Sequence, residues 1–461
     1  HSTSSAASDV YKRQDLIFIW VFNVMPVCIK ERLYFSSLNR RNIEMDFSGG
    51  HVSSDGGVLL LREVDRHIGL TDRISKFLPD LRDQSKVIHS LRSMLQQRVY
   101  GIACGYDDGN DHDTLRHDIA FQTAKNRTST LASPPTLHRF EMLADRNVAI
   151  SAHKAMVESF ITSFDTPPKE LVLDFDATDD LVHGNQEGKF DHGYYGNHCF
   201  LPLYVCCGKD LLVSYLRPSH IDGAKHSWSI LSLLVKRFRQ VWPNVRIIFR
   251  GDGGFCRHKM LNWCERNDVG YIVGMASNKR LEAPLKPMIN VARAAYENSG
   301  QKQRIFMPLS YQAGSWKCSR KVVAKAEYTS KGPNLRFIVT NLEGNSQHIY
   351  DKMYGARGDM ENRITEQQLD LFADRTSCHS WWSNQMRLIL SSLAYILLQR
   401  LRDTALKDTQ LAKATAGTIR NKLLKIGVVI TRNTRRIRLK MASSYPLKQI
   451  FKTVVKRLAR E

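Results

Sequence analysis

Three carboxylates stand where two divalent metal ions could be held for phosphoryl transfer. Asp176 closes a buried strand-like run (LVLDFDAT), Asp252 follows a second one (VRIIFR), and Glu361 lies near the start of an expected helix. Such ions prefer oxygen ligands, and a pair about 4 Å apart activates the attacking oxygen and stabilises the leaving one. Adjacent strands that end in Asp, with a carboxylate from a helix, supply that ligand set. We therefore predict Asp176, Asp252 and Glu361 to be the catalytic and metal-binding residues.

Each of these carboxylates also has a plainer interpretation. An Asp at a strand end is commonly a helix cap or a turn former rather than a ligand. Asp174 competes with Asp176 for the first position, because residues two apart in a strand point to the same face. The glycines on both sides of Asp252 (RGDGG) favour the catalytic interpretation, since they let the backbone turn and a substrate approach.

A stripe of residues surrounds the third carboxylate. Tyr354, Arg357, Glu361 and Gln368 follow one another at spacings of 3, 4 and 7 residues, so a helix would carry all four on one face. An aromatic ring, a cation and a carboxylate on one stripe could bind a stacked base, a phosphate and a metal ion together. The alternative is an ordinary amphipathic helix with a salt-bridged exposed face. We predict that Tyr354, Arg357 and Gln368 contact DNA.

The charge balance points to the same kind of partner. The 461 residues carry a formal net charge of +22, with a pI near 9.6, which is the electrostatic footprint of a nucleic-acid binder. Residues 400–461 hold 17 Lys and Arg against 3 Asp and Glu. A solvated basic surface, or one that binds anionic membrane, is the alternative. Within this region a phosphate-contacting surface is expected at Arg432, Arg435, Arg436, Arg438 and Lys440.

The elements that must position these residues follow from hydrophobic periodicity. Residues 45–165 are expected to be mostly helical. From Leu171 the order of patterns is β-β-β-α-β-α-β, which is the order of a ribonuclease-H-like fold, a mixed sheet flanked by helices. Residues 277–350 interrupt that order with three strand-like segments, so the fold class is α+β with a β-rich insertion. A long helix is expected over 379–402, and the basic tail after it as part strand, part helix.

These patterns give a provisional division of the chain. The opening residues resemble translated adapter sequence, so residues 1–24 are treated as a non-native or disordered leader, with a natural start at Met25 or Met45. The remaining segments are a helical DNA-binding region (40–165), the first part of the catalytic core (166–276), the β-rich insertion (277–350), the end of the core (351–405) and a basic C-terminal segment (406–461).

The motifs resemble those of a known family. The runs DFDATDD and RGDGGF and the pattern Y-x-x-R-x-x-x-E resemble the DDE transposases of bacterial insertion sequences, in the branch with a β-rich insertion. The segments DFSGGHVSSDGGVLLLRE and QMRLILSSLAYILLQRL resemble the group-one DDE transposase domain, so the likeness spans roughly residues 40–455. It implies that Asp176 with Thr178 forms the first motif, Asp252 the second and Glu361 the third. Where the family signature has Lys, this chain has the uncharged Gln368.

The resemblance also implies an activity. Two Mg²⁺ ions, which Mn²⁺ could replace, would serve hydrolysis of DNA strands at the element ends, and the freed 3′ hydroxyl would then join to target DNA. The partners would be double-stranded DNA and further copies of the chain in a synaptic complex, in the bacterial cytoplasm and on the nucleoid, with no membrane involved. A catalytically inactive relic that only binds DNA, and a nuclease that cuts without joining, remain alternatives.

Other residue clusters carry weaker signals. The nine cysteines form no C-x-x-C pair, which favours buried thiols in a reducing compartment over a disulfide framework. The run DDGNDHDTLRHD is expected to be a polar loop that caps a helix rather than a metal site, because it lacks the EF-hand pattern. His183, His192 and His198 lack zinc-site spacing. Trp316 could stack on a flipped base, although a place in the core is the plainer expectation.

Overall fold

The computed structural model describes residues 32–193 and 196–459. The chain divides into two units, with the boundary between Gly50 and His51. The described part of the first unit is an antiparallel hairpin of β1 (Leu33–Leu38) and β2 (Arg41–Met45). The expectations for residues 1–24 and for Met25 lie outside the described residues. Met45 is the last residue of β2.

The second unit is built on an eight-stranded sheet of order β12-β13-β14-β11-β10-β4-β8-β9. In its core, β10 and β11 run parallel to β4, whereas β8 pairs antiparallel with β4 and β9 pairs antiparallel with β8. This is the mixed sheet of the ribonuclease-H-like fold, as the order of sequence patterns predicted. The core elements are β4 (Glu170–Ala177), β8 (Leu203–Cys207), β9 (Asp210–Tyr215), α8 (Ser227–Val241), β10 (Arg246–Gly251), α9 (His258–Arg266) and β11 (Gly270–Met275).

The alternation of residues along β4 separates an apolar face from a polar one. Leu171, Leu173 and Phe175 are buried in the hydrophobic cluster that includes α8 and α9. Asp174 and Asp176 therefore point to the opposite face, because successive strand residues alternate. Between β4 and β8 the chain forms a small sheet of β5 (Asp180–Leu181), β6 (Phe190–His192) and β7 (Asn197–Phe200).

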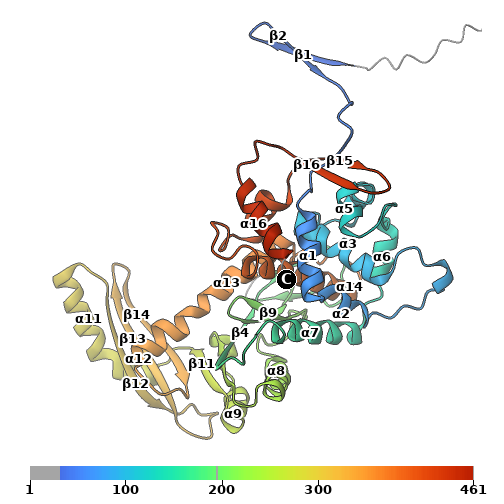
Figure 1. The fold of residues 1–461 in the computed structure, drawn as a ribbon. Helices are drawn as coiled ribbons and strands as arrows, with labels where there is room; N and C mark the ends of the chain where they lie inside the picture. The colour runs from blue at the N-terminus through green and yellow to red at the C-terminus, as the bar shows by residue number, and fades with distance from the viewer. Residues whose placement is uncertain (1–31, 194–195, 460–461) are drawn as a thin grey trace, which may run out of the picture. The chain divides into compact units, whose positions relative to one another are not determined.

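The predicted β-rich segment extends the core sheet rather than standing apart from it. Its strands β12 (Gln303–Tyr311), β13 (Arg320–Thr329) and β14 (Gly332–Thr340) form a meander, and β14 pairs antiparallel with β11. The segment also contains two helices that the sequence patterns did not predict, α10 (Lys279–Glu282) and α11 (Lys286–Ser299). Helix α11 packs along β12 and β13 (Figure 1).

A bundle of helices precedes the sheet in sequence and packs around one long helix, α14 (Trp381–Asp403), which confirms the helix expected over 379–402. Buried apolar residues from these helices and from α14 form one hydrophobic cluster. The helices are α1 (Val58–Ile68), α2 (Leu70–Ser75), α3 (Leu91–Cys104), α4 (His112–Leu115), α5 (Ile119–Ala124), α6 (Pro134–Glu141) and α7 (Arg146–Ile161).

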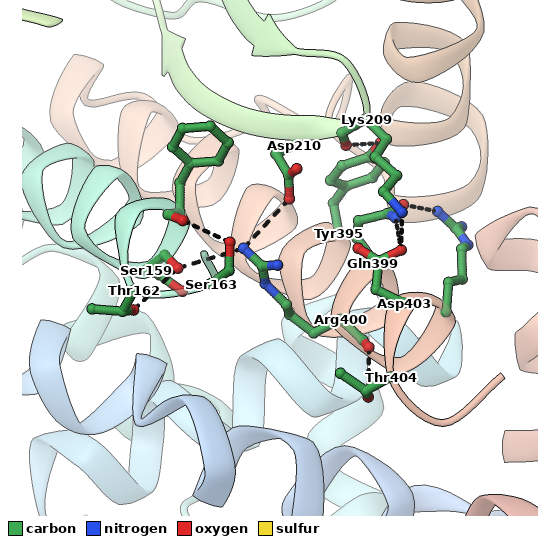
Figure 2. Close-up of polar contacts among 12 residues, drawn as sticks. Ser159, Thr162, Ser163, Lys209, Asp210, Tyr395, Gln399, Arg400, Asp403 and Thr404 are labelled. Carbon is green, nitrogen blue, oxygen red and sulfur yellow. Dashed lines mark hydrogen bonds and ion pairs between the residues drawn. The ribbon is translucent and has the colours of Figure 1, made fainter. Parts of the chain in front are cut away.

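A polar cluster fastens α14 to the outer strands and to α7 (Figure 2). Arg400 lies between Asp210 of β9 and the carbonyl of Ser159 on α7, at 3.4 Å from each. Lys209, in the turn before β9, pairs with Asp403, and its carbonyl accepts a hydrogen bond from Tyr395 at 2.9 Å. Helix α14 is thereby held to both the sheet and the amino-terminal helices.

The C-terminal residues fold back onto the amino-terminal helices instead of forming a separate tail. Strand β15 (Val428–Arg432) pairs with β3 (His51–Ser53) on one side and with β16 (Ile437–Met441) on the other. The last helix, α16 (Lys448–Leu458), packs on α1. The predicted mixture of strand and helix in this segment is confirmed. No helix in the described part of the chain combines the length and apolarity needed to cross a membrane.

Candidate active site

Two acidic side chains stand on the polar face of β4, and their partners distinguish them. Asp174 is 3% exposed, and both of its carboxylate oxygens accept hydrogen bonds from Arg250. Asp176 is 8% exposed and lies where β4 ends. Its carboxylate accepts one hydrogen bond from the guanidinium of Arg357, at 3.1 Å, and one from the next backbone amide. Of the two, Asp176 has the carboxylate that is less occupied by protein partners.

Asp252 begins a short turn after β10. It caps the 3₁₀ turn η3 (Gly253–Phe255), where its carboxylate accepts a hydrogen bond from the Gly254 amide at 2.9 Å. The helix-capping alternative therefore describes part of what Asp252 does, although its side chain is not buried. A glycine on β11 makes this turn possible: a Cβ on Gly274 would lie 2.6 Å from the Tyr354 hydroxyl and 2.7 Å from the Gly253 amide nitrogen.

The third carboxylate lies on a helical segment of irregular pitch, residues 346–370. The segment passes from α12 (Ser346–His348) through a π-helical turn, η5 (Ile349–Tyr354), and a 3₁₀ turn, η6 (Gly355–Arg357). It continues as α13 (Gly358–Thr365) and ends in a second π-helical turn, η7 (Glu366–Asp370). The predicted helix is present, but the changes of pitch mean that regular 3.6-residue spacing does not describe its faces.

Arg357 connects the first and third carboxylates. Its Nη1 donates to Asp176 Oδ2 at 3.1 Å, and its Nη2 donates to Glu361 Oε1 at 3.2 Å. The Glu361 side chain is 66% exposed, whereas that of Asp176 is 12% exposed. A single guanidinium thus lies between a buried carboxylate on the sheet and an exposed one on the helix.

The electrostatic surroundings of Asp176 favour its protonated form. Burial, the largest influence, raises the pKa of Asp176 to about 6, and the negative charges of Asp252 and Glu361 act in the same direction. The nearby charge of Arg357 lowers this pKa and offsets part of the rise. Burial and neighbouring negative charges disfavour the ionised form of a carboxyl group, and a nearby cation stabilises that form.

The three carboxylates suit a hard divalent cation by their chemistry, since all the ligand atoms they offer are oxygens. In the described residues, however, no group of three His, Cys, Asp or Glu side chains is close enough to hold a metal ion. Arg357 lies between Asp176 and Glu361 instead. The residues present fit a divalent ion provided that this arginine turns away.

The remaining residues of the stripe have partners of their own. The Tyr354 hydroxyl lies against Gly274, and burial and the nearby charge of Asp252 both raise the pKa of Tyr354. The Gln368 side-chain amide donates to the Asp179 carbonyl at 3.0 Å, in the loop that follows β4. Gln368 is therefore not turned wholly to solvent.

The basic residues singled out near the C-terminus form a hairpin surface. Arg432 ends β15 and donates a hydrogen bond to the Thr128 carbonyl at 3.1 Å. Arg435 and Arg436 lie in the turn, and Arg438 and Lys440 lie on β16. All five side chains belong to exposed residues.

Three weaker signals have structural explanations. Trp316 is 7% exposed and packs in the sheet's hydrophobic cluster, with the Arg320 guanidinium 4.9 Å from its ring centre, which agrees with the core interpretation. In the polar run 107–118, Asp108 and Asp118 cap short helices. His198 lies 3.8 Å from Asp191 across the β6–β7 hairpin.

Sequence reasoning missed Arg250. This residue lies at the end of β10, is 7% exposed, and bonds to Asp174 and to the Met353 carbonyl. A signal was available, because an arginine that directly follows the apolar residues IIF in a strand needs a partner of opposite charge if it is buried. The partner itself comes from another strand, and spacing along the chain could not identify it.

Comparison with known proteins supports one family. The family described as transposase DDE domain group 1 matches residues 35–461. No curated protein sequence matches the chain. Among solved structures, the chain is similar to a piggyBac transposase seen by cryo-electron microscopy as a synaptic complex with hairpin DNA. The two share 11% identity with a TM-score of 0.39, over 81% of this chain and 80% of that one.

Proposed function

Since the chain belongs to the transposase DDE domain group 1 family, we propose that it binds the ends of a mobile DNA element, cuts them, and joins them to target DNA. The observation that carries this proposal is the arrangement around Arg357, whose guanidinium bonds to both Asp176 and Glu361 while Asp252 lies close enough to raise the pKa of Asp176. Three acidic residues from three separate elements would share one site.

The proposed catalytic residues are Asp176, Asp252 and Glu361, and they would hold two Mg²⁺ ions. When bound, such ions lower the pKa of water and stabilise negative charge on the leaving oxygen. The protein's own part is to present three carboxylates at the end of the sheet. Tyr354 and Gln368 would position the DNA strand, and Arg357 would turn to a phosphate once the ions replace it.

We propose double-stranded DNA as the partner, both element ends and target, since the net charge of +22 suits a polyanion. Arg432, Arg435, Arg436, Arg438 and Lys440 would contact its phosphates, together with the helical region 40–165. Because two ends have to be joined to one target, a homo-oligomer would form the synaptic complex. A bacterial cytoplasmic location, on the nucleoid, follows from the resemblance to insertion-sequence transposases.

A second candidate function is DNA binding without catalysis. It is favoured by Gln368, which stands where the family signature has Lys and is tied to a backbone carbonyl. A neutral amide can bond to a phosphate oxygen, but it lacks the charge that strengthens such a bond. A nuclease that cuts without joining would share the same carboxylates.

One substitution tests the proposal. Asp252→Ala should abolish Mg²⁺-dependent cleavage of a supercoiled plasmid that carries the element ends, while end affinity stays within a few-fold, because affinity comes mainly from phosphate contacts. Glu297→Gln serves as a comparison, since it removes an exposed acidic charge on α11, outside the proposed site. Cleavage retained by Asp252→Ala would refute the metal-ligand assignment. Wild-type protein that only shifts the plasmid would indicate the inactive form, and nicks without joined products would indicate a nuclease.

A further inference from the structure

Arg250 occupies a place where three elements meet. It faces Asp174 across the parallel pairing of β10 and β4. Its Nε and Nη2 donate to the two oxygens of Asp174, the latter at 2.6 Å. Its Nη1 donates to the carbonyl of Met353, in the helical segment 346–370. The Arg250 guanidinium therefore bonds to the neighbouring strand β4 and to the helical segment 346–370 at the same time.

Each of these elements also carries one of the proposed catalytic carboxylates. Asp174 is two residues before Asp176 on β4, and Arg250 on β10 is two residues before Asp252, which follows that strand directly. Met353 immediately precedes Tyr354 and is followed by Glu361 on the same helical segment. A shift of any of these elements relative to the other two would separate the carboxylates.

The chemistry of arginine suits this arrangement. Its planar guanidinium presents five donors in a fixed fork, so it can fill both oxygens of a carboxylate and still donate to a third acceptor. A lysine carries the same charge on a single nitrogen and lacks that planar fork. Both partners are buried, with side-chain exposures of 9% for Arg250 and 4% for Asp174.

We infer that Arg250 and Asp174 are positioning residues that hold β4, β10 and the helical segment 346–370 in register, so that Asp176, Asp252 and Glu361 can bind metal ions together. This inference rests on the proposed function for the role of those three carboxylates. Asp174 is not itself a ligand, because both of its oxygens are engaged by Arg250.

The same sheet offers a matched control. Arg320 on β13 forms a similar bidentate pair with Glu265 on α9, with nitrogen–oxygen distances of 2.7 and 2.8 Å, and also donates to Asn262 at 2.6 Å. Its side chain is 2% exposed. This pair joins a strand to a helix, but neither residue belongs to an element that carries a proposed catalytic carboxylate. Arg320→Lys therefore disturbs a bidentate pair with a buried arginine, although its Glu265 side chain is 31% exposed, without disturbing the register of the site.

The experiment compares full-length wild type, Arg250→Lys, Asp174→Asn and Arg320→Lys. Four quantities are measured: Mn²⁺ affinity from water proton relaxation, affinity for a labelled element end, single-turnover cleavage of that end, and the midpoint of urea unfolding. Arg250→Lys should weaken Mn²⁺ binding at least five-fold and slow cleavage at least ten-fold, with end affinity within two-fold. Both Arg250→Lys and Arg320→Lys should lower the midpoint of urea unfolding. Arg320→Lys should nevertheless keep both Mn²⁺ affinity and cleavage within two-fold of wild type.

Each outcome decides the inference. Mn²⁺ affinity and cleavage that are unchanged in Arg250→Lys, or that fall equally in Arg320→Lys, would overturn it, because the pair would then serve stability alone. If Arg250→Lys does not fold, Asp174→Asn, which keeps one acceptor oxygen, takes its place under the same criteria. If wild type binds Mn²⁺ but cuts no end, the proposed function fails while the Mn²⁺ comparison still decides the positioning role. If wild type neither binds Mn²⁺ nor cuts, both fall.

Discussion

Arg357 is the residue around which the candidate site is organised. Its guanidinium neutralises part of the charge of Asp176 and Glu361, at 3.1 and 3.2 Å. The two ion pairs differ in environment, because Asp176 is buried and Glu361 is exposed to water, which weakens an ion pair. The contact to Glu361 is accordingly the weaker of the two.

Asp176 makes the stability of the metal-free protein depend on pH. Its pKa of about 6 in the folded protein lies above the value of about 3.9 for an unfolded Asp. The folded state therefore binds the proton more tightly, and the resulting stability is present at low pH and lost as pH rises from about 4 to 6. Asn cannot ionise. We expect Asp176→Asn to gain about 2–3 kcal/mol relative to wild type between pH 4 and pH 7.

Urea unfolding of both proteins without metal, at a series of pH values, measures this gain. Addition of Mg²⁺ should reduce the difference, because the ion favours the ionised carboxylate that only the wild type has. A difference in unfolding free energy that is the same at pH 4 and pH 7 would show that the pKa of Asp176 is not raised.

Gln368 offers a second test at the scale of one residue. Its amide bonds to the Asp179 carbonyl, in the loop after the strand that carries Asp176. A lysine there can still donate to that carbonyl, and it adds a charge that attracts phosphate. We expect Gln368→Lys to raise end-specific cleavage or the yield of stable end complex at moderate salt, and Gln368→Ala to lower it only modestly.

Cleavage of a labelled end by the three proteins across a salt series provides the measurement. The gain of Gln368→Lys should shrink as salt rises, since screening weakens a charge contact to DNA. A Gln368→Lys variant that is neutral or harmful at every salt concentration would mean that Gln368 does not lie beside the phosphate backbone.

At the scale of elements, the helical segment 346–370 is held at several points along its length. Arg250 bonds to the Met353 carbonyl near its start. Near its end, Glu366 pairs with Arg402 of α14 and accepts from the Ala416 amide at 2.6 Å, while Asp370 accepts from the Gly417 amide at 2.8 Å. These contacts fix the position of the irregular helical segment relative to β10, to α14 and to residues 416–417.

The β15–β16 hairpin is the element on which the DNA-binding proposal can be tested. Each phosphate contact that is lost should reduce the slope of log affinity against log salt by about 0.9. We expect Arg438→Gln with Lys440→Gln to flatten the slope by about 1–2 and to weaken binding to all sequences alike. Fluorescence anisotropy with a labelled end and with an unrelated duplex measures both effects.

A control of equal charge accompanies this pair. Lys236 on α8 and Lys259 on α9 are also exposed, and Gln at both positions removes the same two charges elsewhere on the core. This control variant should have the same slope of log affinity against log salt as the wild type, within experimental error. Equal slopes in the two double variants would mean that the hairpin contributes only general charge.

At the scale of the whole second unit, residues near the start of its sequence pair with residues near its end. Strand β3 pairs with β15, the Gly56 amide donates to the Ile426 carbonyl at 3.0 Å, and His67 bonds to the Leu458 carbonyl at 2.7 Å. Removal of all residues from Arg432 onward would therefore expose part of the core as well as delete basic charge. Point substitutions test DNA binding more cleanly than truncation does.

The last helix should contribute to the stability of the entire unit. Leu458 is 3% exposed in the cluster that contains α1. We expect Leu458→Ala to lower the free energy of unfolding by about 2–4 kcal/mol, as large-to-small changes in a core do. Lys452→Ala, at an exposed position of the same helix, should change it by less than about 0.5 kcal/mol. A loss of stability confined to the helix itself, seen by hydrogen exchange, would contradict the expectation.

Much of this architecture follows from the sequence by itself. The order of strand and helix patterns from Leu171 to Met275 predicted the mixed sheet, because alternation with a period of two and amphipathic periodicity near 3.6 are local properties. The run DFDAT, the run RGDGG and the stripe from Tyr354 to Gln368 supplied the proposed site residues, of which Asp176 and Glu361 both accept hydrogen bonds from Arg357. Composition alone indicated a polyanionic partner.

Only the tertiary structure decided how these residues are paired. Asp174 and Asp176 point to the same face of β4, and only the neighbouring strand and helix determine that Arg250 occupies one and Arg357 the other. The basic segment after residue 406 looked like a tail in sequence, yet β15 and α16 pack on β3 and α1. The physical reason is that local patterns specify which face of an element is apolar or charged. Long-range packing then selects the partner for that face.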